Sequence, residues 1–193
     1  MLKTIPDGKI LDFIDQKIRN DTPEEYVRQN IERRLALELD YDLGQIAVEF
    51  PIKIGSKRVR VDLAVFPAGA EHIQDNIYII VECKRESVLP SNKRDGIEQL
   101  KSYMSACPNV EWGMWTNGRY KDVFRRVFKN GLFVWEEPND IPSKDGDAEE
   151  VNRPKRELLK QATDDNLLFP SKSATTISTL QMECKSSLPS LSF

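Results

Sequence analysis

The chain has 193 residues, of which 31% are charged, and a formal net charge of -3. This length allows one globular domain with a sizeable core and a tail. No apolar run reaches the roughly 18 residues that a membrane-spanning helix needs. The three cysteines are too few and too far apart for a disulfide framework or a zinc site. With no secretory leader, the chain is expected to be cytoplasmic with no membrane partner, and only local charge clusters could bind nucleic acid.

Two helix signals lie in the first 40 residues. A weakly amphipathic stretch at 10–15 predicts a short helix. The motif Thr22-Pro23-Glu24-Glu25 is typical of a helix start, with threonine as N-cap, proline at the first helical position and the second glutamate closing a capping box. Apolar residues at helical spacing then predict a helix to about Leu39.

Three predicted strands follow this helix. The first spans Ile46–Ile54, and Pro51 within it favours an edge position. The second spans Arg58–Phe66, and its alternation turns Asp62 away from the core. The residues expected to face the core are Val59, Val61, Leu63 and Val65. The third, Ile77–Lys84, begins as a β-branched run typical of a strand buried on both faces.

Residues 92–135 predict a helix, a strand and a hairpin. Helical spacing runs from Asn92 to about Cys107. A buried strand at Trp112–Thr116 is followed by the turn signal Asn117-Gly118. Two further strands are expected at Tyr120–Phe128 and Leu132–Trp135. This order predicts an α/β sandwich with a mixed central β-sheet flanked by helices and a C-terminal β-hairpin.

The composition changes after Trp135. Residues 136–152 are acidic and contain prolines and a glycine, which predicts a linker. Residues 153–193 predict a short helix and a poorly ordered tail, with a lead-in to a further domain as one interpretation. The phosphate-binding motif G-x-x-x-x-G-K-[ST] is absent from the sequence, so no ATP site is expected.

Asp62, Glu82 and Lys84 are the residues whose placement suggests chemistry. They would meet if the second and third strands paired as an antiparallel hairpin. Two neighbouring carboxylates repel each other, which raises one pKa unless a cation lies between them. Mg²⁺ suits such a place because it binds one or two carboxylates and water, and the Cys83 backbone carbonyl could add an oxygen. Lys84 could orient or deprotonate a water and stabilise charge on a phosphate.

Ordinary structural roles also fit these residues. Asp62 could pair with an arginine of its own strand, and Glu82 with Lys84 at a solvated strand end. The buried run that leads into the last two residues favours a functional role. A cationic rim that could follow DNA phosphates would consist of Arg58, Arg60, Arg85, Lys93 and Arg94.

Several ordered motifs carry a family resemblance over about residues 20–135. Asp62 followed by Glu82-Cys83-Lys84 resembles the D…(E)-x-K core of PD-(D/E)xK nucleases, although Val61 stands where a proline is usual. Gln99-Leu100-Lys101-Ser102-Tyr103 resembles the Q-x-x-x-Y motif in the nuclease domain of type I restriction R (HsdR) subunits. Two further segments similar to that domain are Glu24-Glu25-Tyr26-Val27-Arg28-Gln29 and Thr116-Asn117-Gly118.

This resemblance implies a Mg²⁺-dependent DNA endonuclease domain within residues 1–135, with Mn²⁺ as a substitute metal. Its implied partners are double-stranded DNA and the methylase and specificity subunits of a restriction-modification system. The metal ligands would be Asp62, Glu82, the Cys83 carbonyl and either Glu24 or Glu25. Lys84 would position the attacking water, and Gln99 and Tyr103 would organise Lys84 or the phosphate. The alternatives are a non-cleaving nucleic-acid-binding or assembly module on this scaffold and a structured-RNA or repair nuclease.

Overall fold

The computed structural model describes residues 5–146, which fold around one mixed β-sheet. Its six strands are ordered β3-β4-β5-β6-β7-β8; β5 and β6 are parallel, and every other neighbouring pair is antiparallel. The strands are β3 (Ile46–Ile54), β4 (Lys57–Val65), β5 (Ile79–Cys83), β6 (Trp112–Thr116), β7 (Lys121–Lys129) and β8 (Leu132–Glu136). The helices are α1 (Pro23–Leu37) and α2 (Ile97–Ala106), with short 3-10 turns at Leu43–Gln45 and Gln74–Asn76.

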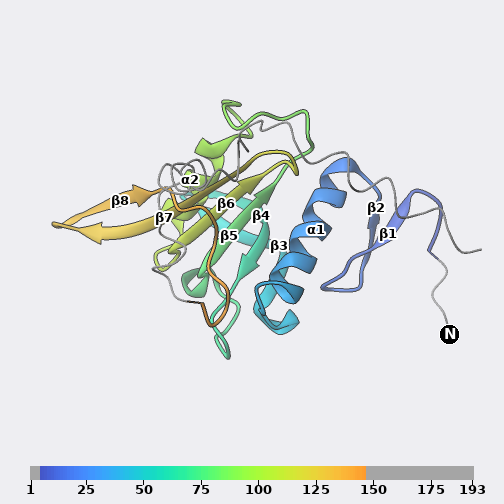
Figure 1. Cartoon of the computed structure of the whole chain (residues 1–193), viewed down its shortest axis with the longest axis horizontal. Coiled ribbons are helices and arrows are strands. Elements are labelled where there is room, and N and C mark those ends of the chain that lie inside the picture. The colour runs from blue at the N-terminus through green and yellow to red at the C-terminus, as the bar shows by residue number, and fades with distance from the viewer. Residues whose placement is uncertain (1–4, 147–193) are drawn as a thin grey trace, which may run out of the picture. The chain divides into compact units, whose positions relative to one another are not determined.

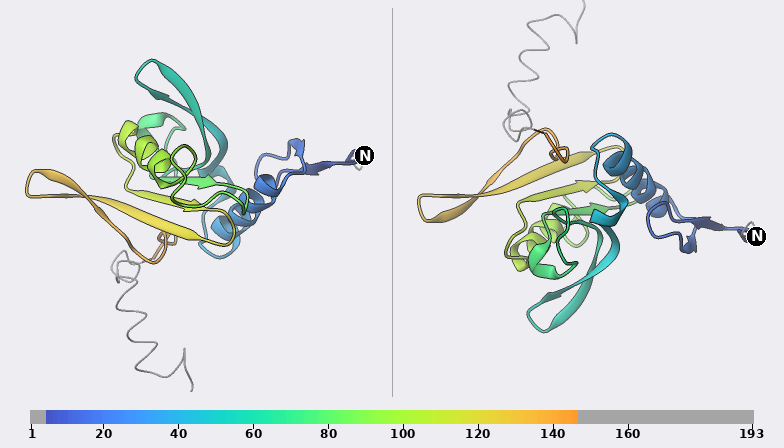
Figure 2. Two further views of the ribbon diagram at one scale, coloured as in Figure 1. Left: turned by 90° about the horizontal axis from the view of Figure 1, so that it is seen from above. Right: turned by 90° about the horizontal axis from the view of Figure 1, so that it is seen from below.

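The two helices cover opposite faces of the sheet (Figures 1 and 2). One apolar cluster contains Leu35 of α1 and the other contains Leu100 of α2, while alternate residues of β5 enter each cluster. A Cβ at Gly113 of β6 would lie 2.2 Å from Met104 Sδ, so α2 packs this closely only against a glycine. The predicted α/β sandwich with a mixed sheet and a C-terminal hairpin is confirmed. Pro51 lies in the edge strand β3, as predicted.

The pattern of β4 differs from the expectation that its apolar residues share one face. Val59 and Val61 pack in the cluster under α2, whereas Leu63 and Val65 pack in the cluster under α1. The change from one face to the other falls at Asp62. Asp62 and the residue opposite it, Glu49, are both left out of the regular pairing between β3 and β4. Glu49 has a φ of +51°. A residue outside the pleat reverses the faces of the residues beyond it. The distortion therefore coincides with the candidate site.

The prediction of a short helix at 10–15 is wrong. A hairpin occupies this stretch, formed by β1 (Lys9–Leu11) and β2 (Ile18–Asn20), and it lies beside α1 (Figure 1). Asp12 Oδ1 accepts hydrogen bonds from the backbone amides of Ile14 and Asp15. Gln16, with φ of +57°, then turns the chain back. These local bonds replace the helical ones, since a single helical turn is weak by itself.

The helix expected from Asn92 begins later, at Ile97. Asn92 Oδ1 accepts hydrogen bonds from the backbone amides of Arg94 and Asp95, which form a turn before the helix. The connection between β5 and α2 is consequently a loop that runs past the end of the sheet beside the candidate site.

The described part of the stretch expected as an acidic linker packs on the domain. Ile141 is buried in the α1-side cluster, and the Tyr41 hydroxyl donates a hydrogen bond to the Pro142 carbonyl (3.1 Å). Asp140 pairs with Arg34 of α1 and Lys121 of β7. Residues 147–193, with the predicted short helix and tail, lie outside the described residues. Within 5–146, no helix has the length and apolarity to cross a membrane.

Candidate active site

The register of β4 and β5 brings the two candidate carboxylates together. Leu63 lies opposite Val81, so Asp62, which precedes Leu63, and Glu82, which follows Val81, become neighbours across the antiparallel pair. Asp62 Oδ2 accepts a hydrogen bond from the Cys83 backbone amide at 2.7 Å. The Asp62 backbone amide in turn donates to Glu82 Oε1 at 3.3 Å. Each carboxylate is therefore held by the backbone of the other strand.

Lys84 places a positive charge between these carboxylates. Its Nζ lies 3.0 Å from Glu82 Oε2 and 3.7 Å from Asp62 Oδ2. Its backbone amide donates to the Thr116 carbonyl of β6 at 2.8 Å, which fixes the chain just beyond the end of β5. The predicted meeting of Asp62, Glu82 and Lys84 is thus present in the structure, formed by antiparallel pairing of the two strands.

Burial shapes the electrostatics of this group. Removal from water raises the pKa of Asp62 and of Glu82, and the charge of Asp62 raises that of Glu82 further. Burial alone would lower the pKa of Lys84, but the charges of Glu82 and Asp62 reverse this, so the net shift is upward. Two carboxylates and one ammonium leave one uncompensated negative charge when all three are ionised.

The group lies at a cleft of about 690 Å³. Asp62, Cys83 and Lys84 line this cleft, while the Glu82 side chain, 1% exposed, lies behind them. Opposite them the cleft is bounded by the first turns of α1 and by β2. The cleft is rich in both signs of charge, which suits a polar or charged ligand.

The oxygen donors of this site fit a hard divalent cation such as Mg²⁺. Asp62 and Glu82 would hold it, the Cys83 carbonyl is the adjacent backbone oxygen, and water would fill the remaining positions. Within 5–146, no three His, Cys, Asp or Glu side chains are grouped as a metal cage. Binding by one or two carboxylates and several waters is a usual mode for Mg²⁺. The upward pKa shifts of the paired carboxyl groups agree with such a fit, because a dication would relieve their repulsion.

Glu24 and Glu25 have different partners. The carboxylate of Glu24 accepts a hydrogen bond from the Arg85 backbone and interacts electrostatically with Lys84 and Asp62. Burial is the main cause of its raised pKa. Glu25 is instead hydrogen-bonded by Arg28 and Gln29. Only half of the predicted capping box is present, because the Glu25 amide donates to the Thr22 side chain while its carboxylate turns to Arg28.

The two α2 residues of the Q-x-x-x-Y motif are hydrogen-bonded to each other. Gln99 Nε2 donates to the Tyr103 hydroxyl at 2.7 Å. Burial raises the pKa of Tyr103, and the charges of Glu82 and Lys84 act on it, so the pair lies beside the site. Gln99 Oε1 is buried without a hydrogen-bond partner among the described residues. An orphaned buried acceptor of this kind marks a position where a bound water or ligand could donate.

The predicted cationic rim is only partly gathered at the cleft. Arg85 lines it. The other four residues are exposed away from its lining, on the β5–α2 loop and on β4: Lys93, Arg94, Arg58 and Arg60. Asn117 has a role that its turn signal did not suggest, because its Nδ2 donates to the carbonyls of Glu86 and Val88. It therefore ties the loop after Lys84 to the β6–β7 turn.

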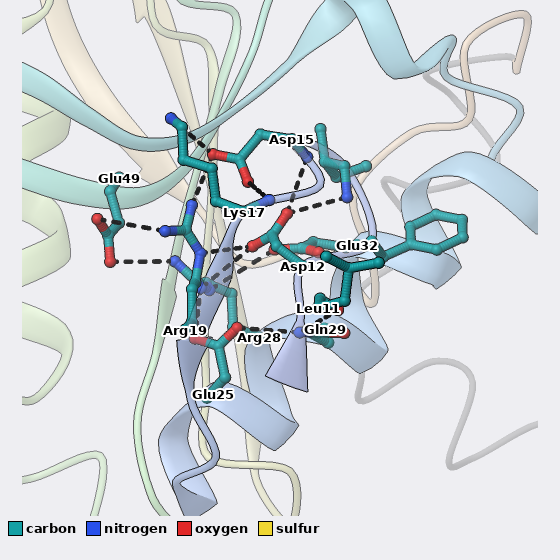
Figure 3. Close-up of polar contacts among 12 residues, drawn as sticks. Leu11, Asp12, Asp15, Lys17, Arg19, Glu25, Arg28, Gln29, Glu32 and Glu49 are labelled. Carbon is teal, nitrogen blue, oxygen red and sulfur yellow. Dashed lines mark hydrogen bonds and ion pairs between the residues drawn. The ribbon is translucent and has the colours of Figure 1, made fainter. Parts of the chain in front are cut away.

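A second charged cluster, which we call the hairpin network, joins the β1–β2 hairpin to α1 (Figure 3). Four of its members line the other side of the cleft: Arg19, Glu25, Arg28 and Glu49. At its centre Arg28 of α1 contacts four carboxylates, and Arg19 of β2 contacts three. The network consists of Asp12, Asp15, Arg19, Glu25, Arg28, Glu32 and Glu49. The helical spacing of Glu25, Arg28 and Glu32 could have predicted its α1 part, but the incorrectly predicted helix at 10–15 concealed Asp12.

Glu32 is the most enclosed member of the hairpin network. Its side chain is fully buried, neither carboxyl oxygen has a hydrogen-bond partner among the described residues, and Arg28 Nε lies 3.6 Å away. Burial is the largest cause of its raised pKa, about 8, and the charge of Asp12 adds to the shift.

Comparison with known proteins identifies the family. The model of type I restriction enzyme R protein N-termini (HSDR_N) matches residues 23–142, which is more than half of the 193 residues. No curated protein and no solved structure matches the chain. The matched range excludes the β1–β2 hairpin but includes the whole six-stranded sheet, α1, α2 and every residue of the candidate site. The chain therefore belongs to the family of type I restriction enzyme R protein N-termini.

Proposed function

We propose that this domain is a Mg²⁺-dependent DNA endonuclease of the PD-(D/E)xK type, acting as the nuclease region of a type I restriction R subunit. The observation that carries the proposal is the mutual anchoring of Asp62 and Glu82 across β4 and β5, with Lys84 between them. Carboxylates joined in this way keep their oxygens at one point, as a metal site requires. Family membership supports the type of enzyme.

The roles of the residues follow from their positions. Asp62 and Glu82 would hold the cation, and Glu24 is the acid best placed to assist from α1. When bound, Mg²⁺ would lower the pKa of a water and neutralise charge on the phosphate. Lys84, as an ammonium on the cleft wall, would orient that water and stabilise the developing negative charge. Gln99 and Tyr103 would keep the space beside Glu82 and Lys84 ordered.

The proposed substrate is the phosphodiester backbone of double-stranded DNA. The methylase and specificity subunits of a type I system are the proposed protein partners, and target recognition would belong to them. Arg85 is the rim residue best placed to contact a phosphate beside Lys84, because it lines the cleft. Mn²⁺ would replace Mg²⁺ in the site, since it accepts the same oxygen ligands.

Calorimetric titration of the full chain with Mn²⁺ and Mg²⁺ tests the metal site directly. Asp62→Ala is expected to abolish binding, because it removes one of two carboxylate ligands. Asp95→Ala is the matched control, since this aspartate also lines the cleft but is not one of the proposed ligands. Equal binding by the wild type and Asp62→Ala would overturn the site assignment.

One observation favours the alternative of a non-cleaving nucleic-acid-binding or assembly module. Lys84 already pairs with both carboxylates, so the three side chains could form a self-contained structural group. The same titration separates the two functions. If the wild-type chain bound neither metal, the structural interpretation would be favoured.

A further inference from the structure

A second hollow, which we call the tyrosine groove, lies between α1 and the β6–β7 turn. It has a volume of about 470 Å³. The groove is lined by Tyr26, Val27, Asn30, Ile31, Arg34, Thr116, Gly118, Arg119, Tyr120 and Lys121. Three of these residues are cations, two are tyrosines and none is an acid. This lining contrasts with the cleft at Asp62, which contains five acids and four cations.

The two tyrosines present their rings to solvent. Tyr26 is 64% exposed and Tyr120 is 42% exposed. The guanidinium of Arg119 lies 5.5 Å from the centre of the Tyr120 ring and is itself largely exposed. Exposed aromatic rings combined with arginine are the residues on which unpaired nucleic-acid bases stack.

The cations of the groove differ in how strongly they are already paired. Arg34 and Lys121 both contact Asp140, which lies outside the groove lining. Within residues 5–146, the ion pair of Arg119 is a long contact of 3.9 Å with the exposed Glu86. Arg119 can therefore turn toward a phosphate or stack on a base at little cost, since exposed pairs of this kind are weak.

Close packing joins the groove to the candidate site. Gly118, with φ of +84°, approaches α1 so closely that a Cβ would lie 3.2 Å from Val27 Cγ2. Consecutive residues of α1 then form a wall of each hollow, with Glu24 and Glu25 in the cleft and Tyr26 and Val27 in the groove. Asn117, just before the turn, holds the carbonyls of the loop that follows Lys84.

We propose that the tyrosine groove binds unpaired nucleotides of a DNA strand that passes the Asp62–Lys84 site, with bases stacked on Tyr26 and Tyr120 and a phosphate at Arg119. The strand's path to Lys84 rests on the function proposed above; the groove itself is a separate binding site. Binding of unpaired nucleotides at the groove narrows the proposed substrate class to DNA that contains, or is opened into, a single-stranded segment. Duplex bases are already stacked on one another and could offer this groove only their phosphates.

Binding of short oligonucleotides to the full chain in EDTA tests the groove without any metal. The probes are a fluorescent oligothymidine and an abasic oligonucleotide of the same length, which carries the same phosphates but no bases. The wild type is expected to bind oligothymidine about a hundredfold more tightly, since two stacked bases each contribute about tenfold. Tyr26→Ala and Tyr120→Ala should each reduce this preference by about tenfold.

The controls separate stacking from general effects. Tyr26→Phe and Tyr120→Phe should keep the preference for bases, because the ring is retained. Phe128→Ala removes a ring about as exposed as that of Tyr26, 66% exposed on β7, and should leave binding unchanged. Equal affinity for the two oligonucleotides, or unchanged binding by both tyrosine-to-alanine variants, would overturn the proposal.

Nuclease activity is measured in a separate experiment, as the cleavage of DNA with Mg²⁺ by the wild type and by Lys84→Ala. If the chain binds bases through the tyrosines in EDTA but cuts no DNA, the groove proposal stands and the nuclease proposal fails. If the chain cuts DNA but shows no tyrosine-dependent binding, the nuclease proposal stands and the groove proposal fails.

Discussion

The two charged clusters that line opposite sides of the cleft are built alike but behave differently. Each has a glutamate buried behind the cleft wall, Glu82 or Glu32, and each has a cation in front of it, Lys84 or Arg28. Burial raises the pKa of both glutamates. The clusters differ in the cation and in the geometry of its partners.

The difference in cation decides what each cluster can do. Arg28 distributes the nitrogens of its planar guanidinium among four carboxylates, which locks the hairpin against α1. Lys84 is a single charge on a flexible stem, with two carboxylates that the backbone already holds. An incoming dication could displace the ammonium without releasing those carboxylates. The proposed metal site therefore belongs to the Lys84 cluster, whereas the Arg28 cluster holds the hairpin against α1.

The largest effect is expected from Lys84→Ala. Cleavage of DNA should fall by about 10²–10⁴-fold, because water orientation and charge stabilisation are both lost. Mn²⁺ binding should persist or tighten, since the competing ammonium is gone. Cleavage assays and calorimetry measure the two results, with the exposed Lys53→Ala as a matched control. Full cleavage by Lys84→Ala would disprove the assigned role.

Arg28→Met tests the other cluster. It leaves Asp12, Glu25 and Glu32 without their shared cation, so the free energy of unfolding should fall by roughly 3–5 kcal/mol. Arg28→Lys should recover only part of this loss, because an ammonium cannot bridge as many carboxylates. Urea unfolding is the measurement. A stability close to that of the wild type in Arg28→Met would break the distinction between the clusters.

Two neighbouring glutamates of α1 belong to different clusters. Glu24→Gln should weaken Mn²⁺ binding about tenfold with little change in stability, because this carboxylate faces Lys84 and Asp62. Glu25→Gln should lower stability by about 1–2 kcal/mol and leave metal binding intact, since its charge serves Arg28. Calorimetry and urea unfolding of both variants measure this. The assignment of the accessory acid would be reversed by the opposite pattern.

The effect of Glu32→Gln on stability is expected to depend on pH. The folded state raises the pKa of Glu32 from 4.5 to about 8, so it binds this proton more tightly than the unfolded chain does. The free energy of folding that this bound proton contributes is fully present below about pH 4.5 and is lost as the pH rises through about 8. Glu32→Gln should therefore be more stable than the wild type at pH 9, by on the order of 1–3 kcal/mol, and similar at pH 4.

Thermal unfolding of Glu32→Gln across this pH range provides the test. Gln29→Glu offers a comparison, because it would add a carboxylate at another buried position of the same helix. It should steepen the loss of stability with rising pH. An identical pH dependence in the wild type and Glu32→Gln would show that Glu32 is not the buried acid that titrates.

Much of the fold and of the site could be predicted from local patterns. Period-two runs located the strands, and the Thr22-Pro23 motif located the start of α1. The spacing of Asp62 and Glu82-Cys83-Lys84 indicated the residues of the site, because two adjacent antiparallel strands bring those positions together. These features depend on neighbours in the chain or on the simplest strand pairing.

The remaining features depend on contacts between distant segments. Local sequence patterns set the order of the elements and the positions of Asp62 within β4 and Glu82 within β5, because backbone geometry imposes the periodicities of helices and strands. Glu24 faces Lys84 just beyond β5, whereas Glu25 pairs with Arg28, which also contacts Asp12 of the hairpin. Lys84 and Asp12 come from segments outside the helix, so their positions depend on the tertiary structure. The pairing of β3 with β4 also set the change of face at Asp62, which coincides with the left-handed conformation of Glu49 on the partner strand.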